Sequence, residues 1–134
     1  MKKDLLLWFS KSSVVYPWRG ELDPYKVWLS EIMLQQTQAQ TVIPYYNNWV
    51  KRFPSINTVA HADLVDILKL WEGLGYYARA RNFYKASKIV VSRHSGEIPR
   101  NDQFILLPGV GDYIDASVRS ICFDLPLPVL DANV

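Results

Sequence analysis

Leu107-Pro108-Gly109-Val110-Gly111 is the stretch that decides the fold, because it is a tight turn set between apolar helical segments. Glycine adopts the left-handed backbone conformations that such turns need, and backbone N–H groups in a turn of this kind can face a phosphate. Further along stands Asp131, after the proline-containing approach of residues 124–128. The turn predicts a contact with the phosphate backbone of DNA. Asp131 predicts a carboxylate that lies beside a sugar of the DNA at which a reaction takes place. Ordinary loops also contain such turns, so the interpretation depends on the rest of the chain.

The segments around this turn have the periodicity of helices. None alternates with the period of a strand, so we predict an all-α fold, a compact multi-helix bundle. Asp23 is placed to cap a helix that opens at Pro24, and Pro44 falls inside another helix, which it would open or bend. The predicted helices begin at Pro24 and cover residues 38–50, 64–71, 76–94, 103–106 and 112–123, with Gly73, Gly75 and Gly96 as stop signals.

Composition limits the class of protein. The chain has 134 residues, of which 49% are hydrophobic, enough for one domain with a core. The net charge of +2 does not by itself indicate a nucleic-acid binder. Five basic residues nevertheless lie close together and predict a local positive face, although a solvated helix face would look the same. They are Arg79, Arg81, Lys85, Lys88 and Arg93.

The single cysteine, Cys122, excludes a disulfide framework and a four-thiolate metal site built from this chain alone. No stretch has the length of a signal peptide or a membrane span, so we expect no membrane partner. An intracellular place beside DNA follows as an expectation: the cytoplasm of a bacterium, or the nucleus or mitochondrion of a eukaryote.

Glu31 stands in a strongly apolar helix, between Val27 and Trp28 on one side and Leu34 on the other. Burial raises the pKa of a carboxyl group, and an acid that stays protonated near neutral pH can donate a proton in catalysis. The sequence therefore offers Glu31 as a general acid. A salt-bridged or capping glutamate on the far side of the helix is the alternative.

Asp131 has the complementary setting, since a helix N-terminus favours the charged form of a carboxylate. A neutral acid and an ionised carboxylate together are what cleavage of a glycosidic bond requires. A plain helix cap is the alternative for Asp131.

The segment Gly73-Leu74-Gly75-Tyr76-Tyr77-Ala78-Arg79-Ala80-Arg81-Asn82 follows a predicted helix. Leu74 and Tyr76 could wedge into a base stack, with Arg79 or Arg81 near a phosphate, as suits an enzyme that extrudes a base. Packing between loop and helix explains the same aromatic residues.

These motifs closely resemble the helix-hairpin-helix DNA glycosylases, and within them the A/G-specific adenine glycosylases of the MutY type. The resemblance runs from Pro17-Trp18-Arg19, through the segment 23–37 that ends in Met33-Leu34-Gln35-Gln36-Thr37, to Asp131-Ala132-Asn133-Val134. It implies hydrolysis of the N-glycosidic bond of adenine paired with 8-oxoguanine or guanine in double-stranded DNA, by a protein we expect to be monomeric.

The resemblance also implies roles for individual residues. Glu31 matches the catalytic acid, and Asp131 the carboxylate that stabilises the oxocarbenium-like sugar. The remaining matches fall into three groups: Trp18, Arg19 and Leu34 at the wall of the base pocket, Gln36, Leu74 and Tyr76 inserting into the duplex, and Gly109, Val110 and Gly111 gripping phosphate, often with an alkali cation.

Tyr113 separates two branches of this family. Relatives resembling endonuclease III have a lysine here that forms a Schiff base; a tyrosine cannot do so, and in some adenine glycosylases it assists at the sugar intermediate. A monofunctional enzyme is therefore implied. A G:T mismatch thymine glycosylase can also carry this tyrosine and is the second reading, although Met33-Leu34-Gln35-Gln36-Thr37 argues against it.

The chain departs from the family pattern in two places. Asp115 is an unexpected acid after the hairpin. The family also holds a [4Fe–4S] cluster on four cysteines after the catalytic aspartate and reads 8-oxoguanine with a further domain, and neither is encoded here. We expect an N-terminal helix and lead-in over residues 1–22 and a truncated glycosylase domain over 23–134. An inactive DNA-binding fragment is the third reading.

Overall fold

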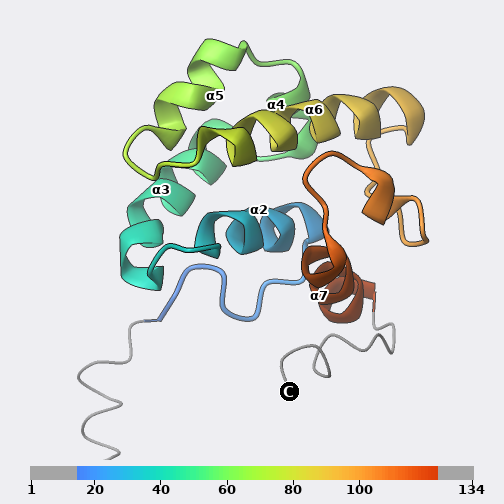
Figure 1. Ribbon diagram of the computed structural model, residues 1–134, viewed down its shortest axis with the longest axis horizontal. Helices are drawn as coiled ribbons and strands as arrows, with labels where there is room; N and C mark the ends of the chain where they lie inside the picture. Colours follow the sequence, from blue (N-terminus) through green and yellow to red (C-terminus); the bar gives the residue numbers. More distant parts are fainter. Residues whose placement is uncertain (1–14, 124–134) are drawn as a thin grey trace, which may run out of the picture.

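The computed structural model describes residues 15–123, which form an all-α fold, as predicted (Figure 1). The N-terminal helix expected within residues 1–22 lies largely outside this part of the chain, and so does Asp131. None of the helices described is long and apolar enough to cross a membrane. The elements are α2 (Pro24–Leu34), α3 (Ala39–Arg52), α4 (Ile56–Ala60), α5 (Leu64–Trp71), α6 (Tyr77–Arg93), the 3-10 helix η1 (Phe104–Leu106) and α7 (Asp112–Phe123).

Helix α2 lies in the core, between α3 and α7. It begins as the sequence predicts, because Pro24 occupies its first turn and the Asp23 carboxylate accepts from the N–H of Tyr25 at 3.1 Å. Trp28 is fully buried and packs edge-to-face on Phe83 and Phe104, with ring centroids 4.8 and 5.1 Å apart. This aromatic cluster fixes the position of α2, and therefore of Glu31.

Helix α3 passes through Pro44 without ending there. Proline lacks the N–H that would bond to the carbonyl of Gln40, but both residues are exposed and water can satisfy that carbonyl. The helix therefore runs to Arg52, slightly beyond its predicted end.

Sequence periodicity missed α4, which has only five residues. A capping box starts it: the N–H of Thr58 donates to the Ser55 hydroxyl at 3.4 Å, and the N–H of Ser55 donates to the Thr58 hydroxyl at 3.2 Å. This serine–threonine pair was the available signal. Helix α4 packs against α6, as does α5, and together they form the upper part of the molecule in Figure 1.

Three glycines shape the loops that carry predicted DNA-binding residues. Gly73 and Gly75 have φ angles of +100° and +78° and turn the chain from α5 into α6. Gly109 has φ +79°, and a Cβ atom there would lie 2.9 Å from Cβ of Asn82 on α6, so the hairpin packs closely against that helix. Helix α7 follows with its predicted bounds.

Candidate active site between α2 and α7

Glu31 lies on α2, which packs against α7. Its carboxyl group is partly buried, and this burial raises its pKa. The nearby Ser117 hydroxyl of α7 opposes part of that rise. Glu31 thus has the environment of a proton donor, and the alternative of a salt-bridged glutamate receives no support from the ion pairs of the described residues.

Tyr113 stands in the first turn of α7, and its side chain is 48% exposed. The negative charge of Glu31 raises the pKa of its phenol, and burial adds to this rise. The phenol therefore stays neutral at physiological pH. Ser117 lies one turn further along α7, and sequence reasoning missed it; the i, i+4 spacing from Tyr113 was the signal that could have placed it on the same face.

The three residues predicted to line the base pocket differ in exposure. Trp18 is half-buried, stacked on Tyr16 at 5.3 Å and edge-on to Tyr46 at 5.4 Å. Arg19 is exposed, while Leu34 ends α2 half-buried, one turn after Glu31. Their roles at a base stay predictions.

The hairpin at residues 107–111 exposes its backbone to solvent more than its side chains. Val110 is buried and its N–H donates to the carbonyl of Leu107 at 3.1 Å, so its side chain belongs to the core. Gly109 and Gly111 are exposed, and a Cβ at Gly111 would meet nothing within 4 Å. Open backbone before the first turn of α7 suits an anion, because the first N–H groups of a helix have no partner inside it.

Gln36 and Tyr76 are both exposed beside a hollow of about 550 Å³, which Arg79 also lines. Leu74, by contrast, is only 7% exposed and lies in the core. In this structure Leu74 does not project as the wedge that its sequence position suggests, because the turn through Gly73 and Gly75 directs it inwards.

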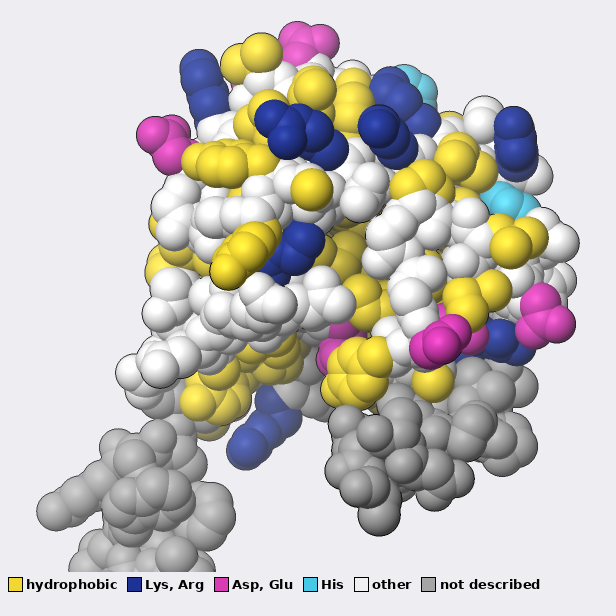
Figure 2. Space-filling view, viewed as in Figure 1, with side chains coloured by type: hydrophobic (Ala, Val, Ile, Leu, Met, Phe, Trp, Pro, Cys, Tyr) yellow, Lys and Arg dark blue, Asp and Glu magenta, His cyan; other side chains and the backbone are white. Residues whose placement is uncertain are grey.

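Arg79 is one of the two arginines predicted to lie near a phosphate, and its contacts within the protein are extensive. Its guanidinium donates to the main-chain carbonyl of Ile32, in the last turn of α2, at 2.7 Å, and to that of Gln35, the C-cap, at 2.6 Å. Burial lowers the pKa of Arg79. The predicted positive face is left to the other basic residues: Figure 2 shows Lys and Arg side chains gathered over the upper part of the molecule, where α5 and α6 run.

Asp115, the unexpected acid, is paired within α7. It is buried and its Oδ2 lies 3.3 Å from Nη1 of Arg119 on the same helix. Arg119 also donates to the carbonyl of Arg100 at 3.2 Å. The acid therefore helps to join α7 to the loop at residue 100.

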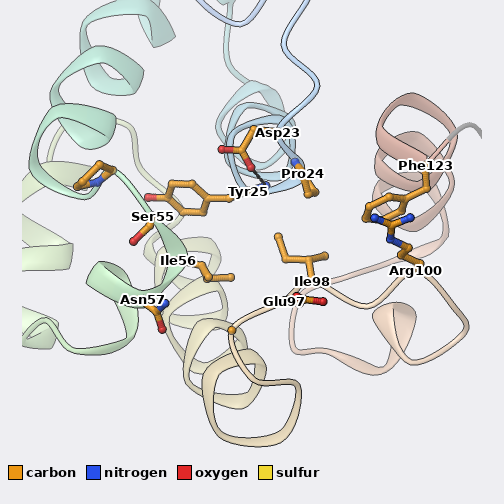
Figure 3. A pocket seen from close by; sticks show the side chains of 12 residues that line it. Asp23, Pro24, Tyr25, Ser55, Ile56, Asn57, Glu97, Ile98, Arg100 and Phe123 are labelled. Atoms are coloured by element: carbon orange, nitrogen blue, oxygen red, sulfur yellow. Dashed lines mark hydrogen bonds between the residues drawn. The ribbon is translucent and has the colours of Figure 1, made fainter.

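A second cleft, of about 330 Å³, lies at the N-terminal end of α2 (Figure 3). Asp23, Glu97 and Arg100 supply its charges, and Ile56 and Ile98 an apolar side. None of the predicted catalytic or DNA-binding residues lines it.

The residues of this chain do not fit a [4Fe–4S] cluster. Cys122 is its one cysteine, and burial raises the pKa of the thiol to about 11, with smaller effects from Asp23 and Glu21. A thiol that resists ionisation is a poor ligand for iron. Within residues 15–123, no group of His, Cys, Asp and Glu side chains is arranged to hold a metal ion.

Sequence comparison connects this geometry to known proteins. Residues 29–134 match the profile of the HhH-GPD superfamily base excision DNA repair proteins. The chain is 49% identical over 119 residues to the adenine DNA glycosylase of Buchnera aphidicola subsp. Baizongia pistaciae, covering 88% of the chain and 34% of that protein. It is 41% identical over 140 residues to the human adenine DNA glycosylase, covering 97% of the chain and 26% of that protein.

Solved structures agree on the fold. A thermostable thymine-DNA glycosylase superposes with a TM-score of 0.80 at 27% identity, covering 98% of this chain and 61% of that one. Endonuclease III in a trapped covalent complex with DNA superposes with a TM-score of 0.74 at 20% identity, covering 92% of this chain and 58% of that one. The chain spans about a quarter to a third of the length of the adenine glycosylases it matches. It belongs to the HhH-GPD superfamily of base excision DNA repair proteins.

Proposed function

We propose that this chain supplies the base-excising site of a DNA glycosylase that hydrolyses the N-glycosidic bond of adenine paired with 8-oxoguanine or guanine. The observation that carries the proposal is Glu31, a half-buried acid with a raised pKa that faces Tyr113 and Ser117 across the contact between α2 and α7. The names of the relatives at 49% and 41% identity favour adenine as the base.

In the proposed reaction, the Glu31 carboxyl donates its proton to a ring nitrogen of the extruded adenine. The C1′–N bond then breaks with both electrons moving to the base, and an oxocarbenium-like sugar remains. Asp131, which lies outside the described residues, is proposed to stabilise that positive charge. Water adds to C1′, and its proton returns to the Glu31 carboxylate.

Tyr113 makes the proposed reaction monofunctional. A lysine could form a Schiff base with the sugar, but a phenol cannot. Because the charge on Glu31 and burial both raise the pKa of Tyr113, the phenol acts as a neutral hydrogen-bonding group beside the sugar.

The likeness to a thymine-DNA glycosylase supports a second candidate, excision of thymine from a G:T mismatch. The identity to that protein is 27%, well below the identity to the adenine glycosylases, so adenine remains our proposal. A third candidate is DNA binding without turnover, since the chain covers only about a third of its relatives.

A single-turnover assay separates the three candidates. Duplexes containing A opposite 8-oxoguanine, A opposite G, or G opposite T are mixed with excess protein, and the released base is measured. We expect adenine release, slowed about 10²- to 10⁴-fold by Glu31→Gln, which keeps the shape but not the proton. Glu97→Gln, at the second cleft, is the matched control. Thymine release would replace the proposal with the second candidate, and binding without release with the third.

Three further properties belong to the same proposal. The exposed glycines of the hairpin are proposed to grip phosphate of the double-stranded DNA, with an alkali cation held at the turn. The protein is proposed to act as a monomer, in the compartment that holds the DNA.

A further inference from the structure

Gln36 and Tyr76 share an unusual backbone conformation. Their φ angles are +59° and +51°, although neither residue is glycine. A left-handed conformation costs an L-residue about 1–2 kcal/mol, so it persists only where the surroundings impose it. These residues lie on loops far apart in the sequence, one after α2 and one before α6, yet both line the 550 Å³ hollow.

Arg79 joins the two loops through their main chains. Its Nη1 donates to the carbonyl of Gln35, which immediately precedes Gln36, at 2.6 Å. Its Nη2 donates to the carbonyl of Gly75, which immediately precedes Tyr76, at 3.4 Å. One guanidinium therefore holds the peptide group before each of the two left-handed residues.

The same guanidinium completes the end of α2. The last carbonyls of a helix have no partner inside it, and α2 has no basic residue in its last turn. Nη1 of Arg79 adds a donor from α6. It donates at 2.7 Å to the carbonyl of Ile32, which also accepts the N–H of Gln35 at 3.3 Å, and it lies 3.5 Å from the carbonyl of Met33.

Two aromatic rings further restrict Arg79. Its guanidinium carbon lies 5.4 Å from the centroid of the Trp71 ring and 5.3 Å from that of Tyr76. Its Nε is buried and has no hydrogen-bond partner within the described residues. These contacts leave little of the guanidinium free for a phosphate.

We infer that Arg79 is a positioning residue that holds the loops of Gln36 and Tyr76 as one surface against the duplex, and is not a phosphate contact. The inference that this surface meets DNA depends on the proposed function. Lysine cannot replace Arg79, because a single ammonium nitrogen cannot reach the carbonyls of both loops while lying against two rings.

The link that Arg79 makes between the loops of Gln36 and Tyr76, called the clamp below, can be tested without DNA. In the wild-type chain, an immobilised guanidinium should give separate, slowly exchanging ¹⁵N–H signals for Arg79, and a single averaged signal would overturn the inference. In Arg79→Lys and Arg79→Gln, hydrogen exchange should accelerate in residues 35–37 and 74–77. Arg81→Gln, an exposed neighbour on α6, should leave both segments unchanged. The wild-type signals decide the matter even if the variants fail to fold.

Salt dependence of DNA binding separates positioning from direct binding of phosphate. When a variant removes one cation that neutralises a phosphate, the slope of log K against log salt becomes shallower by about 0.9. We expect Arg79→Lys and Arg79→Gln to weaken binding about tenfold at every salt concentration, with the slope unchanged. A shallower slope in Arg79→Gln with full binding by Arg79→Lys would show that Arg79 binds phosphate and would refute the clamp. A wild-type chain that binds no duplex would overturn the proposed function, while the exchange and ¹⁵N measurements would still decide whether the clamp exists.

Discussion

The Asp115–Arg119 pair provides the sharpest test of the packing described for α7. Both side chains are only 12% exposed, and Oδ2 of Asp115 lies 3.3 Å from Nη1 of Arg119. The two partners are not equivalent. Arg119 also reaches Oδ1 of Asp102 at 3.4 Å and the carbonyl of Arg100 at 3.2 Å, whereas Oδ1 of Asp115 is buried without a partner in the described part of the chain.

This asymmetry predicts unequal losses of stability. Arg119→Met removes the guanidinium and leaves a buried carboxylate uncompensated, at a cost of about 3–5 kcal/mol. Asp115→Ala leaves Arg119 with its other two acceptors and costs about 1 kcal/mol. The double variant contains neither buried charge, so its stability should lie within about 1–2 kcal/mol of the wild type. Alanine and methionine are both good helix formers, so helix propensity does not confuse the comparison.

Urea denaturation at pH 7, followed by circular dichroism, measures all four proteins. The expected cycle is strongly non-additive: the double variant is more stable than Arg119→Met alone, with a coupling energy of at least about 2 kcal/mol. In thermal melts, Arg119→Met should lower Tm by at least about 10 °C. Equal losses in the two single variants, or additive losses in the double variant, would refute the reasoning.

Three further predictions concern the site. Burial raises the folded-state pKa of Glu31 above its unfolded value of 4.5, so the charge on Glu31 opposes folding at neutral pH. Glu31→Gln should therefore increase the free energy of unfolding measured in urea at pH 7.5. A gain in stability that persists undiminished at pH 4 would contradict this. Tyr113→Phe should slow single-turnover adenine release about 10- to 100-fold with Tm unchanged, since the ring is half-exposed; an unaltered rate would remove Tyr113 from the site. Gly109→Ala should lower the free energy of unfolding by about 2 kcal/mol in thermal melts, because φ at this position is +79° and Asn82 approaches it closely. Gly111→Ala should change that free energy by only about a few tenths of a kcal/mol. Equal effects of the two substitutions would argue against the hairpin geometry.

Helices were the most predictable part of the chain. Periodic apolar residues predicted α2, α5, α6 and α7 close to their bounds, because a helix that buries one face repeats apolar residues every three or four positions. Helix α4 was not predicted, because five residues are too few to show the periodicity of a helix. Only its capping residues, Ser55 and Thr58, marked it locally.

Residues of the site were less predictable. The apolar neighbours of Glu31 in the sequence indicated its burial, since they lie on the same helix. Ser117 was missed, because its approach to Glu31 depends on how α7 packs on α2. Leu74 was predicted to face DNA, yet it packs into the core, since the turn around it sets the direction of its side chain.

The sequence by itself determined the helical class, the turn at Gly109 and the motifs that mark the family, because each depends on residues a few positions apart. Tertiary structure alone decided that Arg79 contacts carbonyls at the C-terminal end of α2, and that Arg119 reaches the carbonyl of Arg100. The reason is physical: the partner of a charged side chain is set by which helices pack together, and local periodicity does not contain that information.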